Sequence, residues 1–153
     1  MWLALQMTTL MIIWIQDMKY HAVTWFLFPL LLLLNGLNQP NEAIVERSLI
    51  NIGLITGMLL MLTLYLSIRQ QRLIWPFQGY FAWGDILLLY AFVPCFEPQV
   101  YLFFFTTGTL FTLCIHALIT IRKRQKQIPF AGYLSLYAGV WFLARQLYPE
   151  LVP

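Results

Sequence analysis

Six apolar segments separated by short polar stretches constrain the fold of this chain more than any other feature. They cover residues 2–16, 22–37, 49–68, 84–96, 99–121 and 130–148. Hydrophobic residues make up 61% of the chain and charged residues only 10%, whereas soluble domains carry about 25% charged residues. A helix needs about 20 apolar residues to cross the hydrocarbon core of a bilayer. The sequence therefore predicts an all-α bundle of about six transmembrane helices, with residues 1–153 as a single transmembrane domain and no separate soluble domain.

The basic residues are divided unequally between the two ends of this expected bundle. One end takes Lys19, Arg69, Arg72, Arg122, Lys123, Arg124 and Lys126, and the other takes Arg47 and Arg145. Basic residues in short loops are retained in the cytoplasm, so the first end is predicted to be cytoplasmic and both termini to lie outside the cytoplasm. Nine basic residues in such clusters are too few for a phosphate-binding surface. We expect a lipid bilayer as the partner, and no nucleic acid.

Four local patterns inside or beside the apolar segments lead to finer expectations. Pro29 lies within the second segment and is expected to kink its helix. Gly53 and Gly57 form a GxxxG pattern, which favours the close approach of another helix. The stretch 73–81 is expected to be an amphipathic segment at the membrane interface. Pro94 is expected to end the fourth span.

Two of the six acidic residues stand apart from the others. Asp17 follows the first apolar segment and Asp85 begins the fourth, so both lie at the predicted cytoplasmic boundary, where an ionisable group suggests a functional site. Two carboxylates brought close together cannot both ionise and share one proton. The ionised member of such a pair can activate water while the protonated member polarises a carbonyl group. The pair therefore favours peptide hydrolysis, with simple capping of helix ends as the structural alternative.

Around these residues the chain resembles the type IV prepilin peptidases. Asp17-Met18-Lys19 is similar to the Asp-x-Arg/Lys element of that family. Ala82-Trp83-Gly84-Asp85 resembles its Gly-x-Gly-Asp element, with Ala82 in place of the first glycine. Ile128-Pro129-Phe130-Ala131 resembles its Ile-Pro-Phe-Ala entry into the last helix.

The resemblance implies an aspartic endopeptidase of the bacterial inner membrane. Such an enzyme removes the short basic leader of prepilin-like precursors, of pilins or pseudopilins, at the cytoplasmic face. Matched residue by residue, Asp17 and Asp85 would be catalytic, and Lys19, Ala82 and Gly84 would contact the substrate. The chain looks like the minimal form, without the amino-terminal methyltransferase region of longer members. No organic cofactor and no metal are implied, and the two cysteines, Cys95 and Cys114, form no CxxC pattern.

Two other functions remain open on the sequence. One is a catalytically inactive relative that acts as a scaffold for secretion subunits. The other is a small transporter that uses Asp17 and Asp85 for ion coupling. A transporter is expected to place such charges near the bilayer midplane, among broken helices, whereas both aspartates are predicted here at one boundary.

Overall fold

The computed structural model is helical in all the parts of the chain that it describes. It describes residues 2–37, 44–71, 82–123 and 128–147, and these contain no strand. The elements are α1 (Trp2–Tyr20), α2 (Leu27–Leu37), α3 (Ile44–Gln70), α4 (Trp83–Ala91), the 3₁₀-helix η1 (Val93–Cys95), α5 (Pro98–Lys123) and α6 (Phe130–Leu147). The expectation of an all-α fold is confirmed.

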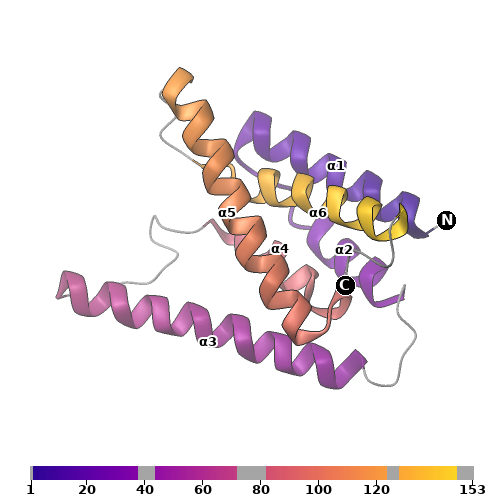
Figure 1. Ribbon diagram of the computed structural model, residues 1–153, viewed down its shortest axis with the longest axis horizontal. Helices are drawn as coiled ribbons and strands as arrows, with labels where there is room; N and C mark the ends of the chain where they lie inside the picture. Colours follow the sequence, from indigo (N-terminus) through magenta and orange to yellow (C-terminus); the bar gives the residue numbers. More distant parts are fainter. Residues whose placement is uncertain (1, 38–43, 72–81, 124–127, 148–153) are drawn as a thin grey trace.

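The helices form one tightly packed group and one outlying member. α1 and α6 lie side by side, α5 packs against α6, and α2 packs against α1 and α4. α3 runs along the opposite edge of the molecule and diverges from α5 along its length (Figure 1). Only Asn51 and Ile55 of α3 are buried. Most of the surface of α3 is therefore exposed, which is typical of a helix that faces lipid or a partner.

Aromatic side chains make up much of the core where α4 ends. Phe96 stacks on Phe104 of α5, with ring centroids 4.8 Å apart, and on Phe142 of α6 at 5.8 Å. Phe92 contacts Phe104 edge-on at 5.3 Å. Such pairs contribute about 0.5–1.5 kcal/mol each beyond the area they bury. These contacts fix the ends of α4, α5 and α6 relative to one another.

Buried amide side chains satisfy the backbone where the chain leaves α4. The Asn51 Nδ2 donates hydrogen bonds to the carbonyl oxygens of Val93 and Phe96, each at 2.9 Å. The Asn35 Nδ2 donates to the carbonyl oxygen of Ala91 at 2.7 Å. Both asparagines are almost fully buried. Buried carbonyl groups at the end of a helix need hydrogen-bond donors from elsewhere in the chain, and these two side chains supply them.

The expectation of six full spans is only partly met. By length and composition, two of the described helices, at Ile44–Gln70 and Pro98–Ile119, are long and apolar enough to cross a membrane. α2 and α4 have 11 and 9 residues, or about 17 and 14 Å at 1.5 Å per residue. Neither reaches across a core of about 30 Å. The spans expected over 22–37 and 84–96 are therefore too long as predicted, because the apolar runs include non-helical residues.

Two finer expectations are wrong. Pro29 does not kink a helix, because α2 begins only at Leu27 and Pro29 occupies its first turn, where the missing N–H is tolerated. The GxxxG pattern does not mark a close helix contact, since a Cβ on Gly53 or Gly57 would meet no atom within 4 Å. The amphipathic segment expected over 73–81 lies outside the described residues.

Candidate active site

Asp17 lies in the last turn of α1 and is buried, with 7% of its surface exposed. α1 ends at Tyr20, and His21 follows with a φ of 49°, in the left-handed region. The His21 N–H donates to the Asp17 carbonyl oxygen at 2.9 Å, as in the left-handed caps that commonly end helices. This local cap fixes the backbone of Asp17, so its side chain leaves α1 at a defined point.

Asp85 lies in the first turn of α4 and is also buried, at 8% exposed. Its Oδ2 accepts a hydrogen bond from the Ala82 N–H at 3.2 Å, while its own N–H donates to the Ala82 carbonyl oxygen at 3.1 Å. This reciprocal pair resembles the carboxylate half of a capping box. Asp85 therefore does cap the start of α4, which is the structural alternative given by the sequence, and its Oδ1 remains available for a second partner.

The start of α6 brings the two carboxylates together. The Ala131 N–H donates to Asp85 Oδ1 at 3.1 Å, and the next N–H, that of Gly132, donates to Asp17 Oδ2 at 2.6 Å. The first N–H groups of a helix have no partner within the helix, and the positive end of the helix dipole favours negative charge there. Two consecutive amides of α6 thus hold two aspartates that are far apart in the sequence.

Gly132 allows this arrangement because it lacks a side chain. A Cβ at this position would lie 3.1 Å from Asp17 Oδ2, 3.3 Å from the Asp17 Cβ and 3.5 Å from the Met18 Cγ. Contacts of 3.0–3.4 Å are tighter than nearly all real Cβ contacts. α1 and α6 therefore approach at Gly132 more closely than an alanine would permit without a shift.

Burial, backbone N–H groups and nearby charge all act on the two carboxyls. Asp17 lies beyond the apolar segment 2–16, and burial raises the pKa of its carboxyl above the ordinary value. The Gly132 N–H and the nearby His21 lower that pKa by less than burial raises it. The charge of Asp17 also acts on Asp85. Because the charge of one carboxylate disfavours ionisation of the other, such a pair keeps one proton more readily than two separate carboxyls do.

The other predicted site residues lie around the pair in different ways. Ala82 contributes its N–H to Asp85 and is exposed. A Cβ at Gly84 would lie 3.4 Å from the Phe28 ring, so this glycine packs α4 against α2. Lys19 is exposed, and its Nζ lies 5.1 Å from the centre of the Tyr20 ring. The structure brings Asp17, Asp85 and Ala82 together, whereas the Lys19 ammonium lies against its own neighbour.

Sequence reasoning missed three residues of α6 that belong to this site. Ala131 belongs to the Ile128-Pro129-Phe130-Ala131 pattern, but the pattern predicts no function for it, and no pattern identified in the sequence includes Gly132. Tyr133 is buried, and its hydroxyl has no hydrogen-bond partner among the described residues. The signal for Gly132 was its place directly after Ile128-Pro129-Phe130-Ala131, in the first turn of a helix, where glycine is unfavourable unless close packing requires it.

Nothing in the described part of the chain gathers three or more histidine, cysteine or acidic side chains that could hold a metal ion. The site consists of two carboxyls and the backbone amides that donate to them. Comparison of the chain with protein-family models, curated proteins and solved structures found no match.

Proposed function

We propose that this chain is a membrane aspartic endopeptidase of the prepilin peptidase kind, with Asp17 and Asp85 as its catalytic pair. Its substrates would be prepilin-like precursors with a short basic leader, cleaved at the cytoplasmic face of the bacterial inner membrane. One observation supports this most strongly: the consecutive amides of Ala131 and Gly132 hold one carboxylate each. Sequence reasoning selected both aspartates from their place at the predicted cytoplasmic boundary, before any contact with α6 was known.

The pair has the groups that peptide hydrolysis requires. One carboxylate accepts a proton from water, whose oxygen attacks the scissile carbonyl carbon, while the protonated partner donates to the carbonyl oxygen. The proton taken from water then passes to the leaving amine as the C–N bond breaks. Among the described residues, Asp17 Oδ1 accepts no hydrogen bond, whereas both oxygens of Asp85 accept one. Asp17 Oδ1 is therefore the oxygen best placed to hold the shared proton or to bind water.

The proposal includes a membrane arrangement. Six helices would lie in the bilayer, with both termini on the external side and the aspartate pair at the cytoplasmic boundary. The short α4 would continue through η1 toward the external side. One contact supports this arrangement: the Arg47 Nη2 and the Glu97 Oε1 are 3.1 Å apart, and both residues belong to stretches predicted to be external.

One observation favours a second candidate, a non-catalytic scaffold. Three of the four oxygens of the two carboxylates accept backbone N–H groups, and these bonds join α1, α4 and α6. A pair kept only for this purpose would be structural. The two functions differ most clearly in what an asparagine does at position 17, because its side-chain oxygen still accepts the Gly132 N–H but cannot exchange a proton with water. At position 85 both oxygens accept an N–H, so an asparagine there also gives up one hydrogen bond.

The test is to replace each aspartate by asparagine and to follow precursor processing. We expect Asp17→Asn and Asp85→Asn each to abolish cleavage of a co-expressed pilin-like precursor while the protein still inserts and folds. The double variant should lose no more than either single one, because members of one catalytic unit fail together. Cleavage is read from the shift to the mature length on a gel and from sequencing of the new amino terminus.

The matched control is Glu97→Gln, which removes a carboxylate that is 62% exposed and paired with Arg47. It should process the precursor at the wild-type rate. Wild-type processing by either asparagine variant would show that the pair is not catalytic and would leave the scaffold or transporter. Unfolding of both asparagine variants would favour the scaffold.

A further inference from the structure

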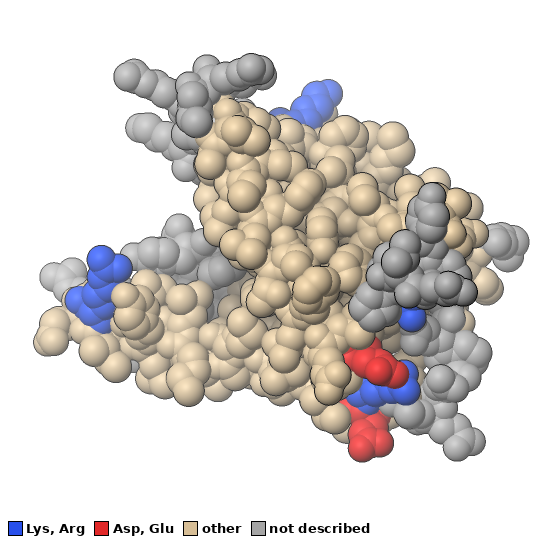
Figure 2. Space-filling model, viewed as in Figure 1, with Lys and Arg blue, Asp and Glu red and all other residues tan. Residues whose placement is uncertain are grey.

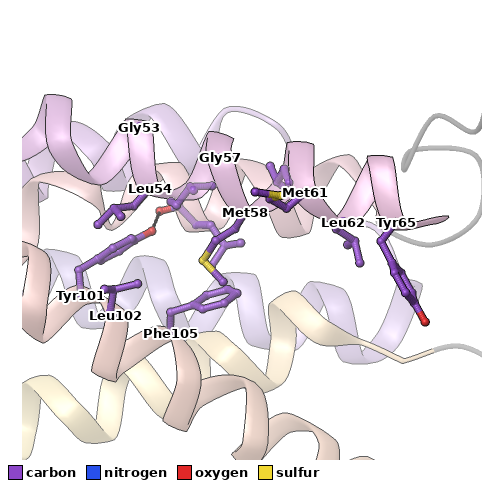
Figure 3. Close-up of a pocket in the computed structure, with 13 residues that line it drawn as sticks. Gly53, Leu54, Gly57, Met58, Met61, Leu62, Tyr65, Tyr101, Leu102 and Phe105 are labelled. Carbon is purple, nitrogen blue, oxygen red and sulfur yellow. Dashed lines mark hydrogen bonds between the residues drawn. The ribbon is translucent and has the colours of Figure 1, made fainter. Parts of the chain in front are cut away.

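A long apolar groove lies between α3 and α5, away from the aspartate pair (Figure 3). Its volume is about 710 Å³. Leu54, Met58 and Leu62 of α3 line one side, and Leu102 and Phe105 of α5 line the other. Figure 3 shows the α5 side chains facing the first half of this row, while Leu62 continues along α3 beyond them. The groove is therefore bounded by α5 over the first half of its length and is open on that side over the second half.

Two glycines deepen the groove on the α3 side. Gly53 and Gly57 both line it, and a Cβ on either would meet no heavy atom within 4 Å. Tyr101 lies on its floor, but the Tyr101 hydroxyl is buried and donates to the Leu89 carbonyl oxygen at 2.9 Å. The Tyr101 hydroxyl is therefore not available to a molecule in the groove, which would contact mostly hydrocarbon groups.

The length of the groove matches one leaflet of a bilayer. From Gly53 to Tyr65 its α3 side extends over 13 residues, and the rise between these two residues is about 18 Å at 1.5 Å per residue. Half of a hydrocarbon core of about 30 Å is about 15 Å. Tyr65 is 58% exposed and ends the row, in the position of an aromatic residue at the membrane interface. Acyl chains lying in the groove would thus bring their headgroup close to Tyr65.

The open end of the groove is basic. Arg69 lies one turn beyond Tyr65, in the last turn of α3, and is exposed. Figure 2 shows basic atoms over this end of α3 and a tan surface along the middle of the helix. The opposite end of α3 instead carries Glu46 and the Arg47–Glu97 pair. Arg69 is thus an exposed basic residue at the end of α3 where a headgroup would lie, and no acidic partner is described for it.

We propose that this groove binds one anionic phospholipid, with its acyl chains along Met58 and Leu62 and its phosphate at Arg69. Basic residues next to apolar clefts between helices bind anionic headgroups on the cytoplasmic side of membranes, which is the predicted side of Arg69. The basic leader of a prepilin-like substrate would be repelled there. A parallel second copy would bring a second Arg69 beside the first. The charge therefore favours lipid, and this proposal does not depend on the peptidase proposal.

The experiment measures lipid bound to the purified, delipidated full-length protein by native mass spectrometry. Phosphatidylglycerol and phosphatidylcholine with identical chains are titrated separately. We expect one phosphatidylglycerol to bind, and phosphatidylcholine to bind at least about fivefold more weakly, the factor that one basic residue near a membrane surface supplies. Arg69→Gln should reduce the preference by the same factor, and Arg145→Gln, at the other end of the molecule, should not.

The groove itself is tested by filling it. Gly53→Leu with Gly57→Leu places side chains into open space, so the protein should fold, and the bound lipid should be lost. The matched control, Leu60→Phe with Leu64→Phe, adds bulk to exposed positions of α3 outside the groove and should leave binding unchanged. Equal binding of the two lipids, or lipid retained in the glycine variants, would overturn the proposal. The glycine variants could instead keep their bound lipid and lose either a dimer or a cross-link to a pilin-like helix. That result would also overturn the proposal, and it would identify the lost partner as the occupant of the groove.

Discussion

Replacing Gly132 by alanine tests whether the geometry at the start of α6 sets catalysis. The new Cβ would lie 3.1 Å from Asp17 Oδ2, the oxygen that accepts the Gly132 N–H at 2.6 Å. The Asp17 Cβ at 3.3 Å and the Met18 Cγ at 3.5 Å limit movement in other directions. Relief requires α1 to retreat from α6 by a few tenths of an ångström, and the Asp17 carboxylate retreats with it.

The effects on stability and on activity are expected to differ in size. Alanine in a helix interior is favoured over glycine by about 1 kcal/mol. Weakening a hydrogen bond to a charged group costs up to about 1.5–3 kcal/mol. We therefore expect a net loss of about 1 kcal/mol in the free energy of unfolding. Because a misplacement of about 1 Å can cost on the order of 100-fold in rate, a shift of a fraction of that should reduce precursor cleavage by roughly tenfold.

The assay is the initial rate of precursor cleavage in reconstituted vesicles, with thermal unfolding of each variant measured in parallel. Gly139→Ala is the matched control. It lies two turns further along α6, and its added Cβ would meet only the Met7 sulfur at 3.9 Å, an ordinary contact. This control should keep wild-type activity and be slightly stabilised. A Gly132→Ala protein that is folded and cleaves at the wild-type rate would refute the claim that the contact between α1 and α6 positions Asp17.

Three further predictions concern topology, the second motif and a buried hydroxyl. A reporter fused after Gln127 should be cytoplasmic and one fused after Pro153 external; the reverse pair would separate the aspartates from a cytoplasmic substrate. Ala82→Gly should maintain or increase cleavage, because glycine allows a closer approach of substrate to Asp85, and complete loss of turnover would contradict this. Tyr133→Phe should raise the free energy of unfolding by about 1 kcal/mol, because it removes a hydroxyl that has no partner among the described residues. Lower thermal stability would show that the hydroxyl has a partner.

The helical class could be predicted from the apolar segments, but the lengths of the helices could not. Apolar runs do not distinguish helical residues from the buried non-helical residues beside them. Residues 92–97 are apolar enough to extend a span, yet α4 ends at Ala91. What permits the break is the position of Asn35 and Asn51, whose amides reach the carbonyls of the 91–96 stretch. That compensation comes from distant parts of the chain, so periodicity within one segment cannot reveal it.

Two aspartates could be selected from the sequence because charge is rare in apolar segments and costly there. Their relation to α6 could not. The sequence separation between Gly132 and Asp17 is 115 residues, and no local pattern reports a contact at that distance. At Gly53 and Gly57 the reverse happens: the local pattern predicts a helix contact, but both glycines face open space. Glycine spacing alone therefore does not tell which helix face is covered; only the packed neighbours do.

The structural function of the two carboxylates and the catalytic function proposed for them meet at the start of α6. Its first four N–H groups are all satisfied: Phe130 donates to the Ile128 carbonyl oxygen, Ala131 and Gly132 to the two aspartates, and Tyr133 to the Pro129 carbonyl oxygen. A buried N–H without a partner costs about 1–3 kcal/mol, so the helix needs acceptors for the N–H groups of residues 131 and 132. Asparagine at position 17 can supply such an acceptor, but it carries no charge and no exchangeable carboxyl proton. Asp17→Asn therefore separates folding from chemistry: a folded protein that cleaves no precursor would show that the carboxyl is needed for the reaction and not for the fold.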